Sequence, residues 1–119
     1  MKYLKSLVSL TTLATLAAAC GGGALPLDKL TEAKSTTRAA QEAGAQSTPQ
    51  AQLHLKMAND ELASAQKAID DNDGDRARLL LNQAQADADL SLTLARGSSD
   101  RAAAQVAQAK IVDLSKQAQ

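Results

Sequence analysis

The stretch that decides the fold is residues 48–95, which read TPQAQLHLKMANDELASAQKAIDDNDGDRARLLLNQAQADADLSLTLA. Alanine and larger aliphatic residues recur in it at alternating steps of four and three, on both sides of the segment DDNDGD at residues 70–75. Such spacing places them on one narrow stripe of an α-helix, as in a coiled coil. The first stripe comprises Ala51, Leu55, Ala58, Leu62, Ala65 and Ile69, and the second comprises Ala77, Leu81, Ala84, Ala88, Ser91 and Ala95.

The acidic segment between the stripes predicts a turn. Asn72 or Gly74 is expected at positive φ, and Asp73 or Asp75 is expected to cap the next helix. A calcium loop is the alternative, but setting the glycine at its sixth position would put Ile69 and Leu80 at two ligand positions, where neither side chain can bind a cation. We therefore favour a plain turn between two helices.

Two helices joined by a six-residue turn are expected to pack as an antiparallel αα-hairpin. The first of them starts with Thr48 as N-cap and Pro49 at the first helical position, where the missing proline N–H costs nothing. We expect the helix seam, and with it any surface for interaction, to be formed by Leu55, Leu62, Ile69, Leu81 and Leu92.

A shorter helical pattern precedes the hairpin, with Asp28 as its expected N-cap. Its stripe consists of Leu30, Ala33, Thr37, Ala40 and Gly44. Each alanine methyl buried in the seams contributes only about 0.8 kcal/mol, so the hairpin alone is marginal. We expect this helix, a second copy of the chain or a partner to cover the rest of the stripe. The predicted fold is an all-α, three-helix, coiled-coil-like bundle over residues 28–119.

The sequence after the second hairpin stripe allows two interpretations. Gly97-Ser98-Ser99-Asp100 could end the helix, with Ser99 or Asp100 capping a fourth one. One long helix with a weak point at Gly97 is favoured, since an isolated glycine costs only about 1 kcal/mol against alanine. A stripe of Ala103, Ala107, Ile111, Leu114 and Ala118 continues to the end. Residues 105–119 could serve as a docking strip for another helix or could be a frayed end.

The N-terminal residues have the layout of an export signal. Lys2 and Lys5 precede an uncharged apolar run over residues 6–19, which is too short to span a membrane. Small residues then lead to the only cysteine, in Leu16-Ala17-Ala18-Ala19-Cys20-Gly21. An ordinary secretory signal is the alternative. The position of the cysteine, directly after the apolar run, favours a signal peptide over residues 1–19 with a cleavage site before Cys20.

This segment resembles the lipobox of bacterial lipoproteins, although leucine stands four rather than three places before the cysteine. The resemblance implies a diacylglyceryl group on Cys20, cleavage before it and a flexible tether over residues 20–27. More than one acyl chain is needed for durable membrane attachment. In such lipoproteins, aspartate at the next position retains the protein in the inner membrane. Gly21 stands there, so the resemblance implies the periplasmic face of the outer membrane.

The stretch from about residue 39 to residue 95 resembles a bacterial domain-of-unknown-function family of alanine-rich lipoprotein domains. The resemblance rests on a helix-starting proline, spaced Ala and Leu, a Gly-Asp turn and a second alanine helix. These are Thr48-Pro49, Leu53, Ala58, Leu62, Ala65 and Ala68, then Gly74-Asp75, Ala77, Leu80, Ala84 and Ala88. Such domains occur alone or before an OmpA-like peptidoglycan-binding domain, which we do not expect here. The family implies no catalytic residues.

Composition argues against several function classes. The sequence has 13 basic and 13 acidic side chains and no basic stripe, so we expect no nucleic-acid partner. Tyr3 is its only aromatic residue. The only histidine, His54, is expected at a partly exposed packing position, because it has too few companions to form a zinc site. The charged residues are interpreted as solvated helix faces: Glu32, Asp60, Glu61, Asp87 and Asp89, with Lys34, Lys56, Lys67 and Arg76. We expect no cofactor, no small-molecule substrate and no enzymatic activity.

Three functions from different classes remain. The first is a structural or adaptor lipoprotein, anchored to the membrane through lipid on Cys20 and binding another envelope protein or itself through its helix seams. The second is a noncovalent cell-wall tether resembling the murein lipoprotein. That protein ends in a lysine joined to peptidoglycan, whereas this sequence ends Lys116-Gln117-Ala118-Gln119, so covalent linkage is not expected. The third, an enzyme or carrier, would need a polar cavity that alanine seams are poorly suited to form.

Overall fold

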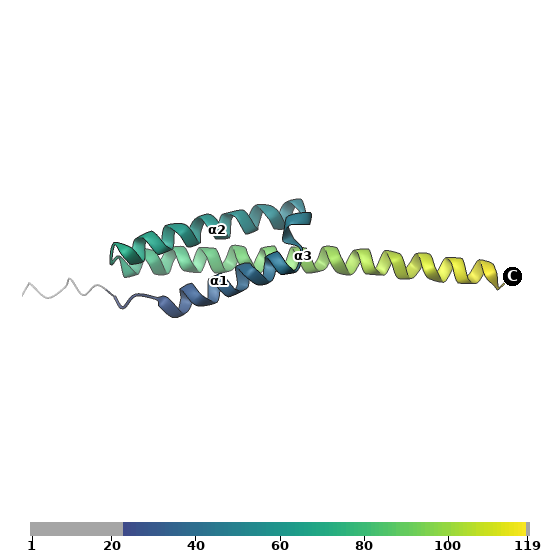
Figure 1. Ribbon diagram of the computed structural model, residues 1–119, viewed down its shortest axis with the longest axis horizontal. Coiled ribbons are helices and arrows are strands. Elements are labelled where there is room, and N and C mark those ends of the chain that lie inside the picture. Colours follow the sequence, from purple (N-terminus) through teal and green to yellow (C-terminus); the bar gives the residue numbers. More distant parts are fainter. Residues whose placement is uncertain (1–22, 119) are drawn as a thin grey trace, which may run out of the picture.

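The computed structural model describes residues 23–118, which form three α-helices and one short 3₁₀ turn. In chain order these are α1 (Leu27–Glu42), η1 (Ala45–Ser47), α2 (Pro49–Asp70) and α3 (Gly74–Gln117). α2 runs antiparallel to α3, and α1 lies along the same half of α3 (Figure 1). The predicted all-α hairpin with a short N-terminal helix is confirmed. The predicted signal peptide and Cys20 lie outside the described residues.

The interface between α2 and α3 is built largely from alanine. All twelve residues of the two stripes predicted for the hairpin are buried, and Ala58, Ala65, Ala84 and Ala88 have no exposed area at all. At Ser91, which is also fully buried, the hydroxyl donates a hydrogen bond of 2.7 Å to the backbone carbonyl of Ala51. A side chain of α3 thus reaches the backbone of α2 directly, and this contact requires the two helices to approach closely.

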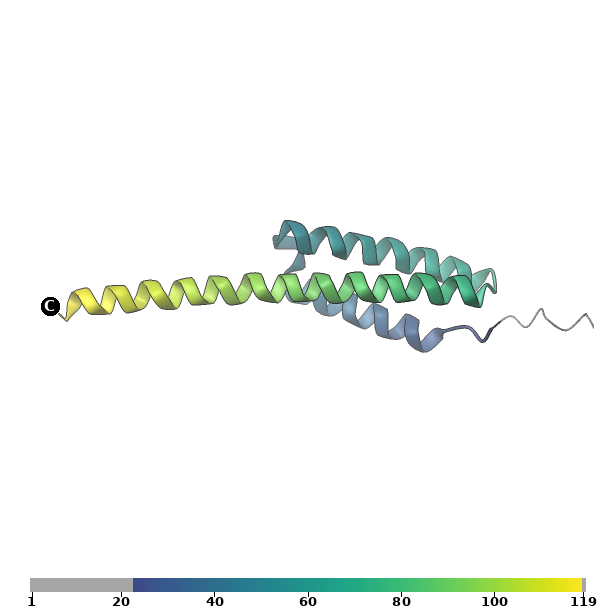
Figure 2. The same cartoon turned by 180° about the vertical axis from the view of Figure 1, so that it is seen from behind.

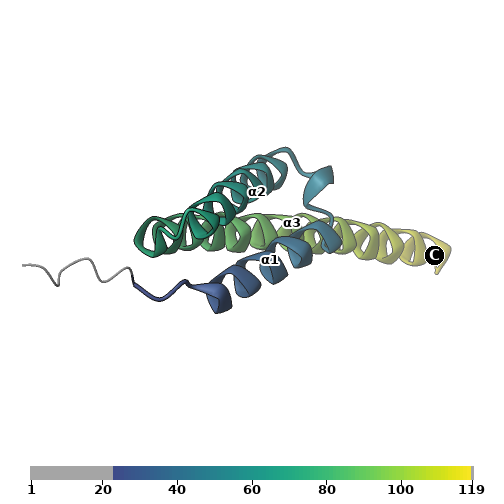
Figure 3. The ribbon, with the colours of Figure 1, turned by 60° about the vertical axis from the view of Figure 1, so that its left-hand side comes forward.

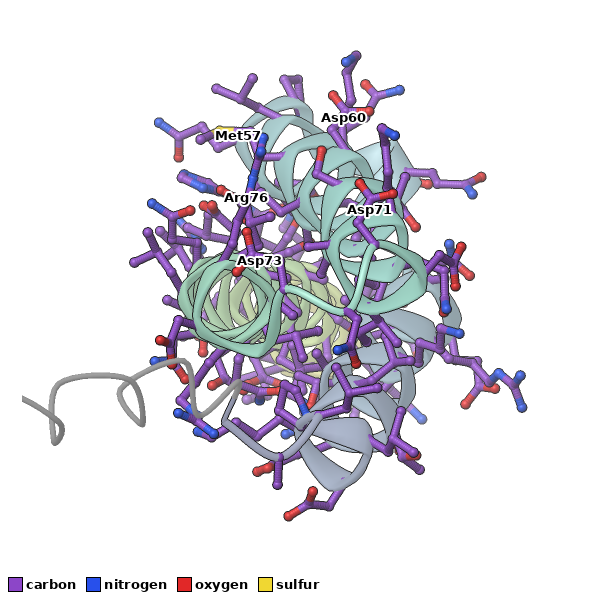
Figure 4. The ribbon with its side chains drawn as sticks, turned by 90° about the vertical axis from the view of Figure 1, so that its left-hand side faces the viewer. Met57, Asp60, Asp71, Asp73 and Arg76 are labelled. Atoms are coloured by element: carbon purple, nitrogen blue, oxygen red, sulfur yellow. The ribbon has the colours of Figure 1, made fainter. Side chains whose placement is uncertain are left out.

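The turn between α2 and α3 is shorter than predicted, because only residues 71–73 lie outside the helices. Asn72 adopts positive φ, at 57°. Asp73 caps α3 by accepting a 3.0 Å hydrogen bond from the backbone N–H of Arg76. Figure 4 looks along the helices from this end, with Asp71 and Asp73 beside the connecting turn. The structure therefore places Asn72 rather than Gly74 at positive φ, and Asp73 rather than Asp75 at the cap of α3.

The chain before α1 packs against the start of α3, which explains the glycine at position 74. A β-carbon on Gly74 would lie 2.4 Å from the backbone oxygen of Gly23, a distance that no side chain could occupy. The guanidinium of Arg78 also donates to the backbone carbonyl of Ala24 at 3.3 Å. The N-terminal end of the described chain is therefore held at the same end of the bundle as the α2–α3 turn (Figure 1).

α1 covers the remaining side of the hairpin. This was one of the three alternatives that the sequence allowed for covering the rest of the stripe. It buries Leu30, Ala33, Thr37 and Ala40. Polar contacts with α3 flank this apolar face: Lys29 Nζ donates to Asn82 Oδ1 at 2.9 Å, and Gln85 Nε2 donates to Thr36 Oγ1 at 3.0 Å. Figure 3 shows α1 beneath α3, with α2 on the other side.

The predicted N-cap of α1 is wrong. The helix begins at Leu27, one residue before Asp28, and the backbone carbonyl of Pro26 accepts the first bond, from Leu30 N–H at 3.1 Å. Asp28 therefore lies inside the first turn, where its negative charge still favours the helix N-terminus.

The connection from α1 to α2 reverses the chain in six residues, 43–48. Gly44 takes φ 86°, a left-handed conformation that glycine adopts without strain. After η1, Thr48 is extended at the N-cap of α2 and Pro49 occupies the first helical position, as predicted. The threonine side chain makes no capping hydrogen bond.

α3 is twice as long as α2 and continues far beyond the bundle. Its 44 residues pass through Gly97 without a break, so the favoured prediction of one long helix is confirmed. At 1.5 Å per residue the helix measures about 66 Å. We call residues 99–118 the arm. Every residue of the arm is exposed, and in the views of Figures 1 and 2 it projects away from the bundle at the end opposite the α2–α3 turn.

A bulkier residue in the alanine interface should destabilise the bundle. We expect Ala58→Leu to lower the free energy of unfolding by about 1–3 kcal/mol, because the added methylenes have no space between α2 and α3. Ala63→Leu, at an exposed position of the same helix, is the matched control and should change it by less than about 0.5 kcal/mol. Chemical denaturation followed by circular dichroism measures both. Equal effects of the two substitutions would contradict close packing at Ala58.

Candidate interaction surfaces

The leucine and isoleucine side chains predicted to form the seam lie mostly inside the bundle. Leu55, Leu62, Ile69 and Leu81 are buried, whereas Leu92 is half-buried and packs against a cluster that includes Ala51 and Ala95. These residues hold the helices of one chain together. That they also bind another molecule stays a prediction. The exposed surface of the bundle and of the arm is formed by other residues.

A polar cluster flanks the alanine interface and was not anticipated. His54 and Glu61 lie seven residues apart on α2, and therefore on one face of the helix. Asp87 approaches both of them from α3, with its Oδ1 2.7 Å from His54 Nδ1. The side chains of this pair are 25% and 16% exposed, so water has only limited access to it.

Glu61 is the unusual member of this cluster. Its Oε2 atom is buried without a hydrogen-bond partner among the residues that the structure describes. Burial raises the pKa of Glu61 above its usual value, and the negative charge of Asp87, a hydrogen bond shared with Asp87 and the charge of Asp60 raise it further. Two carboxylates that share one site favour holding a proton between them. The surroundings of Glu61 therefore disfavour its charged form relative to a solvent-exposed glutamate.

The interpretation of all charged residues as solvated faces is thus wrong for Glu61 and Asp87. A signal was present in the sequence, since His54 and Glu61 flank the α2 stripe at a spacing of one heptad. The approach of Asp87 depends on the register between the two helices, which the stripes alone do not fix. His54, by contrast, occupies the partly exposed packing position that was predicted.

The cluster does not amount to a metal site. Across residues 23–118, no group of three or more His, Cys, Asp or Glu side chains is placed to hold a metal ion. No helix in this part of the chain is long and apolar enough to cross a membrane.

A shallow hollow lies where the start of α2 meets the base of the arm. It is lined by Thr48, Pro49, Gln50, Ser98, Arg101, Ala102 and Gln105. The hollow is open to solvent along much of its surface, so it would not enclose a small ligand.

The arm carries the largest exposed aliphatic side chains near the C-terminus. Val106, Ile111, Val112 and Leu114 are between 42% and 70% exposed. A soluble helix usually buries such residues against a neighbour. No element within residues 23–118 covers them, so the predicted C-terminal stripe is a free helix face rather than a continuation of the bundle core.

A sequence model of a protein family matches residues 28–110, and the family is described as a domain of unknown function, DUF4398. The chain belongs to this family. The DUF4398 match covers α1 from its second residue and all of α2, and it continues through α3 to Lys110, so it includes more than half of the arm as well as the bundle. The resemblance to a domain-of-unknown-function family, expected from the Thr48-Pro49 and Gly74-Asp75 signals, is confirmed, and the lipoprotein character of the chain stays a prediction. No curated protein and no solved structure gives a significant match to the chain.

The raised pKa of Glu61 predicts a pH-dependent effect on stability. A raised carboxyl pKa gives stability that is fully present below the unfolded-state pKa and is lost as pH rises through the folded-state pKa. Above its folded-state pKa, Glu61 is an ionised carboxylate that is poorly solvated and lies close to Asp87. We expect Glu61→Gln to raise the free energy of unfolding at pH 7 by about 0.5 kcal/mol, because the neutral amide can donate to Asp87.

This gain should shrink as the pH falls, because protonation of Glu61 in the native chain removes the poorly solvated charge. Denaturant titrations at pH 4, 5.5 and 7 measure it, and Glu32→Gln at an exposed position of α1 is the control. If Glu61→Gln instead lowered the free energy of unfolding at pH 7, the expectation would be contradicted, because the ionised carboxylate would then be stabilised by its surroundings.

Proposed function

We propose that this protein is a lipoprotein of the outer membrane, facing the periplasm, with a structural or adaptor role. Lipid on Cys20 would anchor it, and an exposed helix face would bind another envelope protein or a second copy of the chain. The observation that carries this proposal is the arm, which exposes large aliphatic side chains on a helix longer than its own bundle requires.

The relative positions of the two ends of the molecule support an anchored arrangement. Gly23, the first described residue, packs against Gly74 at the start of α3, whereas the arm forms the other end of the same helix. An anchor at Cys20 is only three residues before Gly23. Anchor and arm would therefore lie at opposite ends of a helix about 66 Å long, and the arm would reach well beyond the anchoring point.

The polar character of the bundle surface favours binding through the arm rather than through α2. Around the exposed parts of α2, charged side chains pair with one another, as Lys56 does with Asp60 and Lys67 with Asp71. Such pairs are well solvated, and the large apolar side chains that α2 exposes are Leu53 and Met57, against four on the shorter arm. The arm offers aliphatic area without a covering neighbour, which is what a helix-binding partner requires.

Anchoring is tested by fractionating cells that produce the full chain. We expect the native protein in the outer-membrane fraction and Cys20→Ser in the soluble or unprocessed fraction, because the sulfur that would carry the lipid is gone. Membrane attachment that survives Cys20→Ser would contradict the anchor.

Binding through the arm is tested by crosslinking in cells with a photoreactive residue at Ile111. We expect a discrete product containing an envelope protein or a second copy of the chain, identified by mass spectrometry. A photoreactive residue at Lys67 on α2, whose side chain is 78% exposed, is the matched control and should give no such product. The same products from both positions, or none from Ile111, would argue against a role for the arm.

A further inference from the structure

α3 carries a second, largely apolar stripe on the side that faces away from α1 and α2, and Gln83, Thr93 and Asp100 interrupt it. It starts at Leu79 and follows alternating steps of four and three to Ala118, so it runs along nearly the whole helix. We call it the outer stripe. Its four large aliphatic residues, Leu79, Leu90, Ile111 and Leu114, are between 42% and 60% exposed.

The outer stripe is distinct from the stripe that packs in the bundle. The bundle stripe includes Leu81, Ala88 and Ala95. The outer stripe includes the residues two positions earlier, Leu79, Ala86 and Thr93. A step of two residues on an α-helix leads to the opposite side, so the two stripes lie on different faces. Of its members only Gly97 is half-buried, and the others are exposed. Half of the stripe lies on the bundle and half on the arm, so one straight partner helix could cover both.

We infer that this partner is the α3 helix of a second copy, packed antiparallel on the outer stripe with its centre between Ser98 and Ser99. This inference rests on the proposed binding through an exposed helix face, and it specifies the occupant and the register. The seven-residue repeat implies that the two helices wrap around each other with a left-handed twist.

Large and small residues face each other in this register. Leu79 meets Ala118 of the second copy, Ala86 meets Ile111, and Leu90 meets Ala107. Nearer the centre, Thr93 meets Ala104 and Gly97 meets Asp100, and Leu114 meets the methylene groups of Gln83. Each layer of an interface between helices fills best when a large side chain faces a small one. The arm of each copy would thus cover the outer face of the other bundle.

The charges beside the stripe select the same register. Asp89 of each copy would face Lys110 of the other, which gives two ion pairs. A shift of the register by one heptad in one direction would place Arg96 opposite Lys110. A shift in the other direction would place the two Arg96 side chains opposite each other and Leu90 opposite Asp100. A parallel pair would place the two Asp100 carboxylates in the same layer of the seam, whereas the proposed antiparallel register separates them into two layers, where each faces Gly97. Each of these alternatives sets like charges together or buries a carboxylate against an aliphatic side chain.

The register is tested by disulfide formation between two differently tagged full-length copies in the same membranes. One copy carries Leu90→Cys and the other carries Ala107→Cys, and Cα atoms must lie within about 7 Å for the bond to form. We expect a mixed dimer of the two tags after mild oxidation. The matched control pairs Leu90→Cys with Leu114→Cys, one heptad away, and the unsubstituted chain gives the background from Cys20.

The result would overturn the inference if position 90 formed a disulfide with position 114 or with itself, or if it formed none. A second measurement uses the charges, with sedimentation of the full chain in detergent. We expect Asp89→Lys or Lys110→Asp to weaken dimerisation about tenfold, and the double substitution to restore it. Dimerisation that both single substitutions leave unchanged would also overturn the register.

Failure of the dimer can be told apart from failure of the proposed function. If the disulfide is absent but the photoreactive residue at Ile111 captures another envelope protein, the dimer is wrong and the adaptor role stands. If the mixed dimer forms but the native chain is not in the membrane fraction, the dimer stands and the anchored function is wrong.

Discussion

The structure depends on the close approach of α2 and α3 through a seam of alanine. Because each layer is small, the backbones come near enough for the Ser91 hydroxyl to reach the carbonyl of Ala51. The same closeness brings Asp87 against His54 and leaves an oxygen of Glu61 without solvent. Alanine layers bury little apolar area, so the hairpin also needs α1 along its open side, where Leu30 and Ala33 complete the core.

The arrangement of the helices could be predicted because each level of the sequence pointed to the same answer. The four-three stripes, the Thr48-Pro49 start and the acidic turn all indicated a hairpin, and the burial of Leu55, Leu62 and Leu81 agrees with them. Gly97 was compatible with two outcomes, and the strong helix formers that begin at Arg101 favour continuity. Two features were not predicted from the sequence. The contact of Glu61 with Asp87 is set by the register between helices, and the start of α1 by the carbonyl of Pro26 rather than by a side chain.

The family match and the shape of the molecule restrict the function without naming it. The match extends from α1 into the arm and ends at Lys110, so the family pattern includes the first part of the arm together with the bundle. A helix that is covered on one side by its own chain and left apolar on the other is typical of an assembly element. The small open hollow at the base of the arm gives no comparable support for a ligand-binding role.

Because α3 is continuous, one helix has two very different degrees of protection of its backbone amides from solvent exchange. Up to about Ala95 its backbone amides are shielded by tertiary packing, whereas beyond that point the helix depends on its own hydrogen bonds and on local propensity. Most of the stability of a helix in a protein comes from tertiary packing rather than from propensity. Fraying from the C-terminus should therefore stop at the bundle, and amide hydrogen exchange should rise along a single unbroken helix. Whatever covers the arm would extend the ordered length of α3, so the end of this helix reports on the state of assembly.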